Sequence, residues 1–396
     1  MKRIISLVLV MLMCSMTLAS CFLTQIICKH DDPSRIVIVP RVEPTQTENG
    51  LTEGMKCTAC GTMVVPQIVI AKLGGEEQGQ YKLGLGVCAG DFSYGRINLT
   101  VASVVLNSEG KIVECRIDAV YNGYNADYDN QEIYINNFKT KAELGYDYLM
   151  STYGQSTIGN NTVKEWFEQA RAFEQWVVGK TANEVAHMEL QTMPNGYIIS
   201  ADEDLLNAGC TIMITDFINA VVKACNDEQG MKFEANAPFT VGLGINNMDN
   251  GSSISSDDGA SIKMISYIAT SVIVNGKIVA ALNDAAYTAV EFNIDGEVIN
   301  DGSINFKTNR ELKENHGMSN LHIDNNGDGI CLEWYIQSNE LSKYVVGMNE
   351  SDLKNMRTQT VNGHTISADE ALLNAGCTID ITYLQDVLVE SVTNAR

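Results

Sequence analysis

Apolar, β-branched runs bounded by polar turn residues predict two β-hairpins, one in each half of the chain. Each consists of two runs rich in β-branched and apolar residues, at 97–106 with 112–120 and at 262–274 with 277–282. A short polar turn separates the first pair, and Asn275-Gly276 separates the second. Asn-Gly between two such runs is among the strongest short-range signals of a hairpin. We therefore expect an antiparallel strand pair in each half.

A segment whose apolar residues recur with helical periodicity follows each hairpin. Apolar residues recur on one face of 163–178, and the same spacing returns in the second half. Apolar residues at this spacing are typical of an amphipathic helix packed on a sheet. The tryptophan in each segment is therefore expected in the core. The positions that share this face are Trp166, Ala170, Phe173 and Val177, matched by Trp334, Ser338, Leu341 and Val345.

Cap residues predict two short helices after each long one, because a hydroxyl or amide three residues ahead of an acid can close a capping box. The predicted starts are Thr181-x-x-Glu184, Asn349-x-x-Asp352, Ser200-x-x-Glu203 and Ser367-x-x-Glu370. Gly209 and Gly376 are expected to end the last pair. A brief strand, Cys-Thr-Ile, and then a closing helix from Thr215 or Thr382 complete the pattern.

The most extensive internal similarity joins two segments of sixteen residues. Residues 200–215 read SADEDLLNAGCTIMIT, residues 367–382 read SADEALLNAGCTIDIT, and only two positions differ. With the paired hairpins and helices, this match indicates one domain present twice. Each copy is long enough to form its own core. We predict an α+β fold of two tandem domains, each a small antiparallel sheet with packed helices.

The N-terminus predicts export. Lys2 and Arg3 precede an apolar run, 4–13, that is too short to span a bilayer and is followed by small residues, as in a bacterial signal peptide. The segment ending at Cys21 resembles a lipoprotein processing box, which implies that Cys21 is acylated and holds the chain at the outer face of the cell membrane. The alternative is ordinary cleavage near Ala19 and a free secreted chain. The predicted segments are a signal peptide at 1–20, a Cys-rich module and linker at 21–78, and the repeats at 79–228 and 229–396.

The net charge and the distribution of cysteines limit the classes of function to be considered. The formal net charge is −22 and no stripe of Lys and Arg is present, which argues against nucleic-acid binding. Nine cysteines follow Cys21, an odd number shared unevenly between the copies, so a disulfide framework is not expected. Only Cys210 and Cys377 occupy equivalent positions. They are therefore either packed in a tight turn or take part in chemistry.

The segment before the first repeat contains a Cys-x-x-Cys pair. Cys57 and Cys60 have the spacing of a zinc knuckle, and Cys28 and His30 could complete a tetrahedral site. A disulfide between Cys57 and Cys60 and a redox-active pair are the alternatives. The segment also resembles the short Cys-rich modules of surface proteins from anaerobic Gram-positive bacteria, in which a cysteine stands at the position of Gln46.

The repeated Ala-Gly-Cys-Thr turn, with the hairpin before it and the helix after it, resembles the FMN-binding domain of bacterial electron-transfer proteins. In that family a Gly-Ala-Thr turn carries FMN on its threonine, through a phosphoester bond made by a separate flavin transferase. The resemblance places Gly209-Cys210-Thr211 and Gly376-Cys377-Thr378 at these positions, with cysteine in place of alanine. It implies Thr211 and Thr378 as FMN acceptors. The implied function is extracytoplasmic electron transfer to an unknown redox partner, with the flavin as the redox group.

A structural interpretation competes for the same residues. Small residues are needed for packing in any tight turn, and a buried Cys210 is a compact apolar filler. The chain would then be a cell-surface binding or scaffolding protein without a cofactor. The segment 324–329 has the opening of a calcium loop, but Tyr335 stands where a bidentate glutamate is required, so we predict a polar loop.

Overall fold

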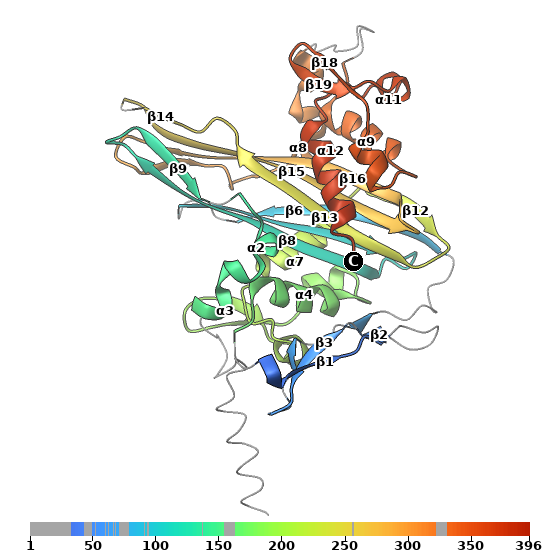
Figure 1. Ribbon diagram of the computed structural model, residues 1–396. Helices are drawn as coiled ribbons and strands as arrows, with labels where there is room; N and C mark the ends of the chain where they lie inside the picture. Colours follow the sequence, from blue (N-terminus) through green and yellow to red (C-terminus); the bar gives the residue numbers. More distant parts are fainter. Residues whose placement is uncertain are drawn as a thin grey trace, which may run out of the picture. The chain divides into compact units, whose positions relative to one another are not determined.

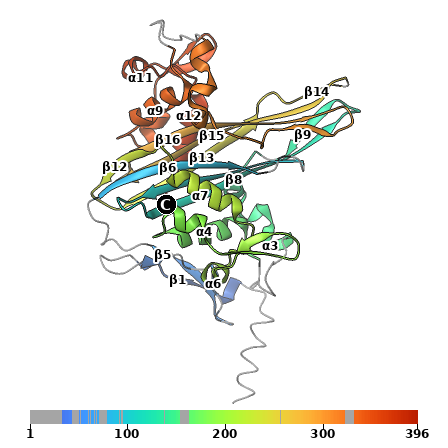
Figure 2. The same ribbon diagram turned by 180° about the vertical axis from the view of Figure 1, so that it is seen from behind.

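The computed structural model describes residues 33–42, 50–51, 53–59, 61, 63–65, 67, 69–70, 79–90, 92, 95–136, 138–153, 163–255, 257–321 and 331–396. It divides the chain into two compact units, Met1–Glu77 and Gln78–Arg396. Figures 1 and 2 show the chain from opposite sides. The two sequence repeats lie together in the second unit.

The first unit contains short strands in two small antiparallel sheets, ordered β1-β3-β4 and β2-β5. Cys57 ends β3 and is fully buried. The N–H of Gly61 donates to the carbonyl of Cys57 at 2.8 Å, so a tight turn follows this cysteine. The elements are η1 (Pro33–Arg35), β1 (Ile36–Val39), β2 (Gly50–Leu51), β3 (Gly54–Cys57), β4 (Met63–Val65) and β5 (Val69–Ile70).

The second unit contains two larger antiparallel sheets. The first has the order β12-β6-β7-β8-β9 and the second β13-β15-β16-β17, with β14 also paired to β15. Residues of β12 follow the predicted boundary at 228, yet this strand pairs with β6 of the first sheet. The strands are β6 (Gly79–Ala89), β7 (Arg96–Leu106), β8 (Ile112–Asp127), β9 (Glu132–Asn136), β12 (Met231–Ala235), β13 (Phe239–Asp249), β14 (Ser253–Ser255), β15 (Gly259–Val274), β16 (Lys277–Phe292) and β17 (Val298–Asp301).

Helices and one small two-stranded hairpin occur in the same order in each repeat. In the first repeat they are α2 (Lys141–Leu144), η2 (Gly145–Tyr148), α3 (Met150–Tyr153), α4 (Trp166–Val177), α5 (Ala182–Ala186), β10 (Leu190–Thr192), β11 (Ile198–Ser200), α6 (Glu203–Asn207) and α7 (Thr215–Cys225). In the second they are α8 (Asn309–Leu312), η3 (Lys313–His316), η4 (Met318–Leu321), α9 (Trp334–Tyr344), α10 (Glu350–Lys354), β18 (Thr358–Val361), β19 (His364–Ser367), α11 (Glu370–Asn374) and α12 (Thr382–Thr393). The predicted α+β class is confirmed.

The second unit is built in four layers. Its two sheets pack face to face over an aliphatic core that includes Leu83, Val101, Ile268 and Val272. The outer face of the first sheet is covered by α4 and α7, and that of the second by α9 and α12 (Figures 1 and 2). The layers follow from the strands, whose alternate side chains face a helix layer on one side and the other sheet on the opposite side.

Glycines bring the closing helices onto the sheets. A Cβ atom on Gly84 would lie 2.0 Å from the carbonyl oxygen of Ala224 in α7, and one on Gly242 would lie 1.6 Å from that of Ser391 in α12. Backbone of β6 and β13 therefore touches helix backbone directly, which only glycine permits.

Polar contacts also join the two sheets. The hydroxyls of Ser103 in β7 and Thr270 in β15 lie 2.6 Å apart across the sheets, and Thr270 in turn donates to the carbonyl of Gly242 in its own sheet at 2.9 Å. Arg310 forms a buried ion pair with Asp227 at 3.2 Å. Because buried polar groups are stable only when paired, these contacts fix how the two halves pack together.

Most predicted elements are confirmed, with two corrections. Both hairpins, both long helices and both closing helices are present, although β16 extends ten residues beyond the predicted end at 282. The serines of the last predicted caps are not caps: Asp202 and Asp369 cap α6 and α11, and the hydroxyl of Ser200 instead accepts a bond from the N–H of Asp202. The expected Cys-Thr-Ile strand is absent at both described positions, because the Thr211 N–H bonds to a side chain instead of a neighbouring strand.

Candidate functional site

The Ala-Gly-Cys-Thr turn has the same geometry in both repeats. The glycines adopt left-handed backbone angles, with φ of +92° at Gly209 and +88° at Gly376, and each N–H donates back to a helix carbonyl at 2.9 Å. A Cβ atom would lie 2.7 Å from the Lys164 side chain in the first turn and 2.4 Å from that of Leu332 in the second. The left-handed backbone conformation therefore favours glycine, and a larger residue would also displace the side chain that lies over the turn.

The motif threonines are buried and bonded to a glutamine of the long helix. The N–H of Thr211 donates to Oε1 of Gln169 at 2.8 Å, and the Thr211 hydroxyl lies 3.4 Å from the same oxygen. Thr378 and Gln337 repeat these contacts at 2.8 and 3.3 Å. Only 7% of Thr211 and 4% of Thr378 is exposed. This contact ties the turn to α4 or α9.

The glutamine amides are themselves fully engaged. Nε2 of Gln169 donates to the carbonyl of Lys164 at 2.8 Å and contacts the sulfur of Met150 at 3.4 Å. Gln337 does the same with Leu332 and Met318, at 2.8 and 3.5 Å. Each glutamine thus joins the turn, the start of the helix and the segment before it.

A glutamate at the start of each long helix completes the network. Glu165 accepts bonds from the N–H groups of Met150 and Ser151, at 2.9 and 3.0 Å. Glu333 makes the equivalent bonds at 3.0 and 3.2 Å, and hydrogen bonding to Ser319 lowers the pKa of its carboxyl. Both carboxylates thus serve as hydrogen-bond acceptors for the segment before the helix.

The cysteines of the turn are buried fillers in this structure. Cys210 and Cys377 are fully buried and belong to the helix-side cores of their repeats. Burial raises the pKa of each thiol to about 12. At neutral pH both are protonated, and a protonated thiol is a poor nucleophile and metal ligand.

Two glutamines essential to the turn were missed by the sequence interpretation. Gln169 and Gln337 are 0% and 3% exposed. Each is the last residue of a Glu-Trp-x-x-Gln pattern, which begins at Glu165 and at Glu333. That recurrence was a usable signal, because a glutamine kept on the buried face of a helix needs polar partners. Trp166 and Trp334 are buried in the core, as expected.

Most of the remaining predicted site residues fall on segments that the structure does not describe. Cys21, the predicted lipid attachment site, and Cys28, His30 and Cys60 of the predicted zinc site lie outside the described residues, as does 324–329. Cys57 is described and buried. Among the described residues, no helix is long and apolar enough to cross a membrane.

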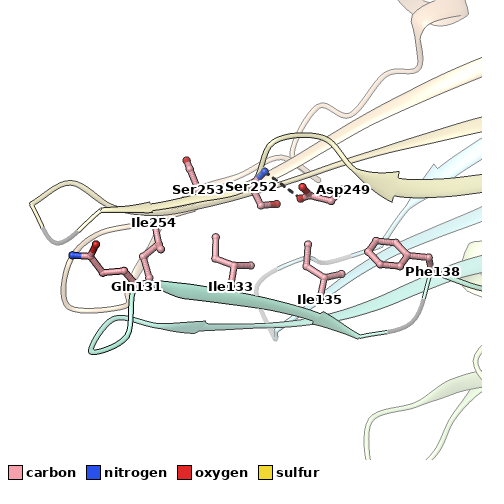
Figure 3. A pocket seen from close by; sticks show the side chains of 8 residues that line it. All are labelled: Gln131, Ile133, Ile135, Phe138, Asp249, Ser252, Ser253 and Ile254. Atoms are coloured by element: carbon pink, nitrogen blue, oxygen red, sulfur yellow. Dashed lines mark hydrogen bonds between the residues drawn. The ribbon is translucent and has the colours of Figure 1, made fainter.

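An open groove of about 550 Å³ lies between the far ends of the two sheets (Figure 3). Ile133 and Ile135 project from β9 toward Ile254 of β14, and Phe138 lies at one end. The polar side of the groove is held by Asp249, whose carboxylate accepts a bond from the N–H of Ser252 at 3.1 Å. The lining is mixed, with four apolar residues facing the polar Gln131, Asp249, Ser252 and Ser253, so the groove offers both apolar and hydrogen-bonding contacts to a ligand or partner segment.

Comparison with known proteins adds little. No protein-family model matches the chain. No curated protein matches it either. A solved structure of a predicted exported protein with a YmcC-like fold from Bacteroides fragilis is 6% identical, with a TM-score of 0.10, and the match covers 57% of this chain and 92% of that one. A likeness of this size carries no structural argument.

Proposed function

We propose that the chain is an exported, membrane-anchored protein that binds or scaffolds a partner at the cell surface without catalysing a reaction. The observation that carries this proposal is the bond between Gln169 and Thr211, with its copy between Gln337 and Thr378. A threonine that accepts a cofactor must present its hydroxyl to a transferase. Here both hydroxyls face a buried glutamine, which supports a structural purpose for the repeated motif.

The groove supports a binding role. Two of its isoleucines, Ile133 and Ile135, pack against the core between the sheets and stay partly exposed in the groove. Apolar side chains around a hollow are typical of ligand and partner sites. Anchoring through Cys21 would present this surface outside the cell membrane.

The second candidate is the FMN carrier. The observation that favours it is that the Gly-Cys-Thr turn occurs in both repeats directly before the closing helices α7 and α12. On this proposal Thr211 and Thr378 would each hold one FMN, attached by a flavin transferase. The flavin would supply one- and two-electron chemistry, and the protein would bind it and set its exposure. Attachment would require both turns to open.

Co-expression with an active flavin transferase distinguishes the two candidates. The binding proposal predicts an intact mass without flavin and a colourless protein. The carrier proposal predicts two added FMN groups, one lost in Thr211→Ala, one in Thr378→Ala and both in the double variant. A wild-type protein that gains flavin at these threonines overturns the binding proposal. A transferase substrate made in the same cells shows that the enzyme was active.

A further inference from the structure

Strand β9 forms an open edge of the first large sheet. It pairs with β8 on one side, and no strand among the described residues pairs with its other side. About half of the N–H and C=O groups of an edge strand point away from its neighbour and can bind a further strand. The sequence of β9, EIYIN, contains no proline and no lysine, the residues that commonly block such an addition. Its free side can therefore accept an extended segment of another chain.

The two faces of β9 differ in polarity. Ile133 and Ile135 are partly buried and project across the groove toward Ile254 of β14 (Figure 3). The side chains between and beside them are exposed on the opposite face: Glu132, Tyr134 and Asn136. A strand added beside β9 would follow the same alternation, with every second side chain directed into the groove. Such a segment needs apolar residues at alternate positions.

The hairpin ends around this edge are strongly acidic. Residues 124–139, 249–263 and 291–301 contain ten acidic residues and two lysines, a net charge of −8 within 42 residues. The fold brings these segments together at one end of the unit. The hydroxyl of Tyr128 in the first segment donates to the carbonyl of Asn293 in the third at 3.2 Å, and β9 and β14 line one groove. The groove thus lies in a concentrated negative field.

The carboxylates nearest the groove have no cationic partner within the protein. In the part of the chain that the structure describes, Asp127, Asp129, Glu132 and Asp249 form no ion pair. Nor do three His, Cys, Asp or Glu side chains converge in a metal-binding group among the described residues. Separate carboxylates match a row of separate cations better than a single metal ion, which needs several ligands at one point.

We propose that the open edge of β9 binds an extended, cationic segment of a partner protein, in which apolar residues alternate with lysine or arginine. Its backbone continues the first sheet, its apolar side chains enter the groove beside Ile133 and Ile135, and its cations face the carboxylates. Charge identifies the occupant, because a second copy of this chain would bring its own acidic turns and be repelled. The inference rests on the proposed binding role and names the class of partner.

A short peptide tests the inference on the purified protein. The probe is a fluorescently labelled Lys-Val-Lys-Val-Lys-Val-Lys with a blocked C-terminus, titrated by fluorescence anisotropy. Three control peptides replace every lysine by glutamate, replace the central valine by proline, or keep the composition but group the valines together. The probe should bind about tenfold or more tightly than each control, because charge, strand addition and alternation are all required. Raising the salt from about 50 to about 500 mM should weaken it by on the order of tenfold.

Matched variants locate the binding site. Asp127→Asn with Glu132→Gln should weaken binding by roughly tenfold, whereas Glu203→Gln with Asp204→Asn removes the same charge from the exposed start of α6 and should leave it unchanged. Ile133→Thr should weaken binding severalfold while the salt dependence stays the same, because it removes an apolar contact and no charge. Circular dichroism checks folding. The peptide comparison on the wild type decides the matter even where a variant is unfolded.

Three results would overturn the inference. One is that the probe does not bind, and another is that the proline and grouped controls bind as tightly as the probe, which would show attraction between net charges without strand addition. The third is that calcium binds stoichiometrically and displaces the probe, which would assign the acidic turns to a metal ion. Failure of the binding role itself has a different signature, namely flavin attached at Thr211 and Thr378. A flavin-free protein that ignores the probe loses only this site.

Discussion

The side-chain oxygen of Gln169 accepts a 2.8 Å hydrogen bond from the backbone N–H of Thr211, 42 positions further along the chain. The partners are fully or nearly fully buried, and the bond recurs in the second repeat. It connects the repeated turn to the long helix, so a helix residue and not the turn alone sets the position of the threonine. A hydroxyl held against Gln169 is not free to accept a cofactor, so this contact bears on whether Thr211 is a structural residue or an attachment point.

Removal of the glutamine should destabilise the protein more than removal of the threonine hydroxyl. Gln169→Leu removes the acceptor of the buried Thr211 N–H and the donor to the Lys164 carbonyl, at a cost of about 2 to 3 kcal/mol of unfolding free energy. Thr211→Val keeps the backbone bond and loses the 3.4 Å contact between its hydroxyl and Gln169, at a cost of about 1 kcal/mol. Urea denaturation measures both. A Thr211→Val variant that loses as much stability as Gln169→Leu would contradict the assignment.

Elements with strong local signals could be predicted from the sequence. The hairpin at Asn275-Gly276 formed as expected, because both residues adopt the positive φ angles that a type I′ turn requires, +49° and +75°. The capping boxes at Thr181 and Asn349 are also present. In these cases neighbouring residues determine the geometry, so tertiary structure is not needed to find it.

Features that depend on long-range contacts could not be predicted. Ser200 and Asp202 were both plausible caps, and the pairing of β11 with β10 places Ser200 in a strand instead. The glycine-rich β6 and β13 have weak strand propensity. Their glycines allow the backbone of α7 or α12 to approach closely, a contact that the sequence does not reveal. Both faces of these strands are apolar, so the sequence does not show which face packs on helices and which on the other sheet.

Alanine at Gly242 should be poorly tolerated. Its Cβ would lie 1.6 Å from the carbonyl oxygen of Ser391, so α12 must move away from β13. We expect a loss of about 3 kcal/mol or more in unfolding free energy, in the upper range for an overpacked core. Thermal unfolding followed by circular dichroism measures it.

Gly276→Ala is the matched control. This glycine has a φ of +75°, but nothing lies within 4 Å of the Cβ position. Only backbone strain is expected, at about 1 to 2 kcal/mol. If Gly242→Ala were the milder of the two variants, the close approach of helix and strand would be wrong.

Acylation of Cys21 predicts membrane association that a single substitution removes. Cys21→Ala should shift the protein from the detergent-rich phase to the aqueous phase, or leave the signal peptide attached, because a thioether-linked lipid needs the cysteine. Detergent phase partitioning with N-terminal mass analysis measures this. Cys28→Ala serves as the control and should remain in the detergent-rich phase. Recovery of an unmodified N-terminus from the wild type would support ordinary cleavage near Ala19.

Asp284 should make the protein less stable as the pH rises from about 4 to about 6. Burial raises the pKa of this carboxyl from 3.8 to about 6, although Arg310 opposes the shift. The folded state therefore binds the proton more tightly than the unfolded state does. The resulting stability is fully present below pH 3.8 and is lost as the pH passes 6, a change of about 2 to 3 kcal/mol.

Asp284→Asn removes this titration while keeping an oxygen that can accept the N–H bonds of Ala285 and Arg310, which are 2.7 and 3.1 Å long in the wild type. Urea denaturation of both proteins at several pH values between 4 and 7 gives the difference in unfolding free energy. Asp118 has a similarly raised pKa and is present in both proteins, so its contribution cancels. The wild type should lose its advantage over Asp284→Asn across this range. Parallel stability curves would show that the buried carboxyl is ionised throughout, with the Arg310 guanidinium outweighing the cost of burial.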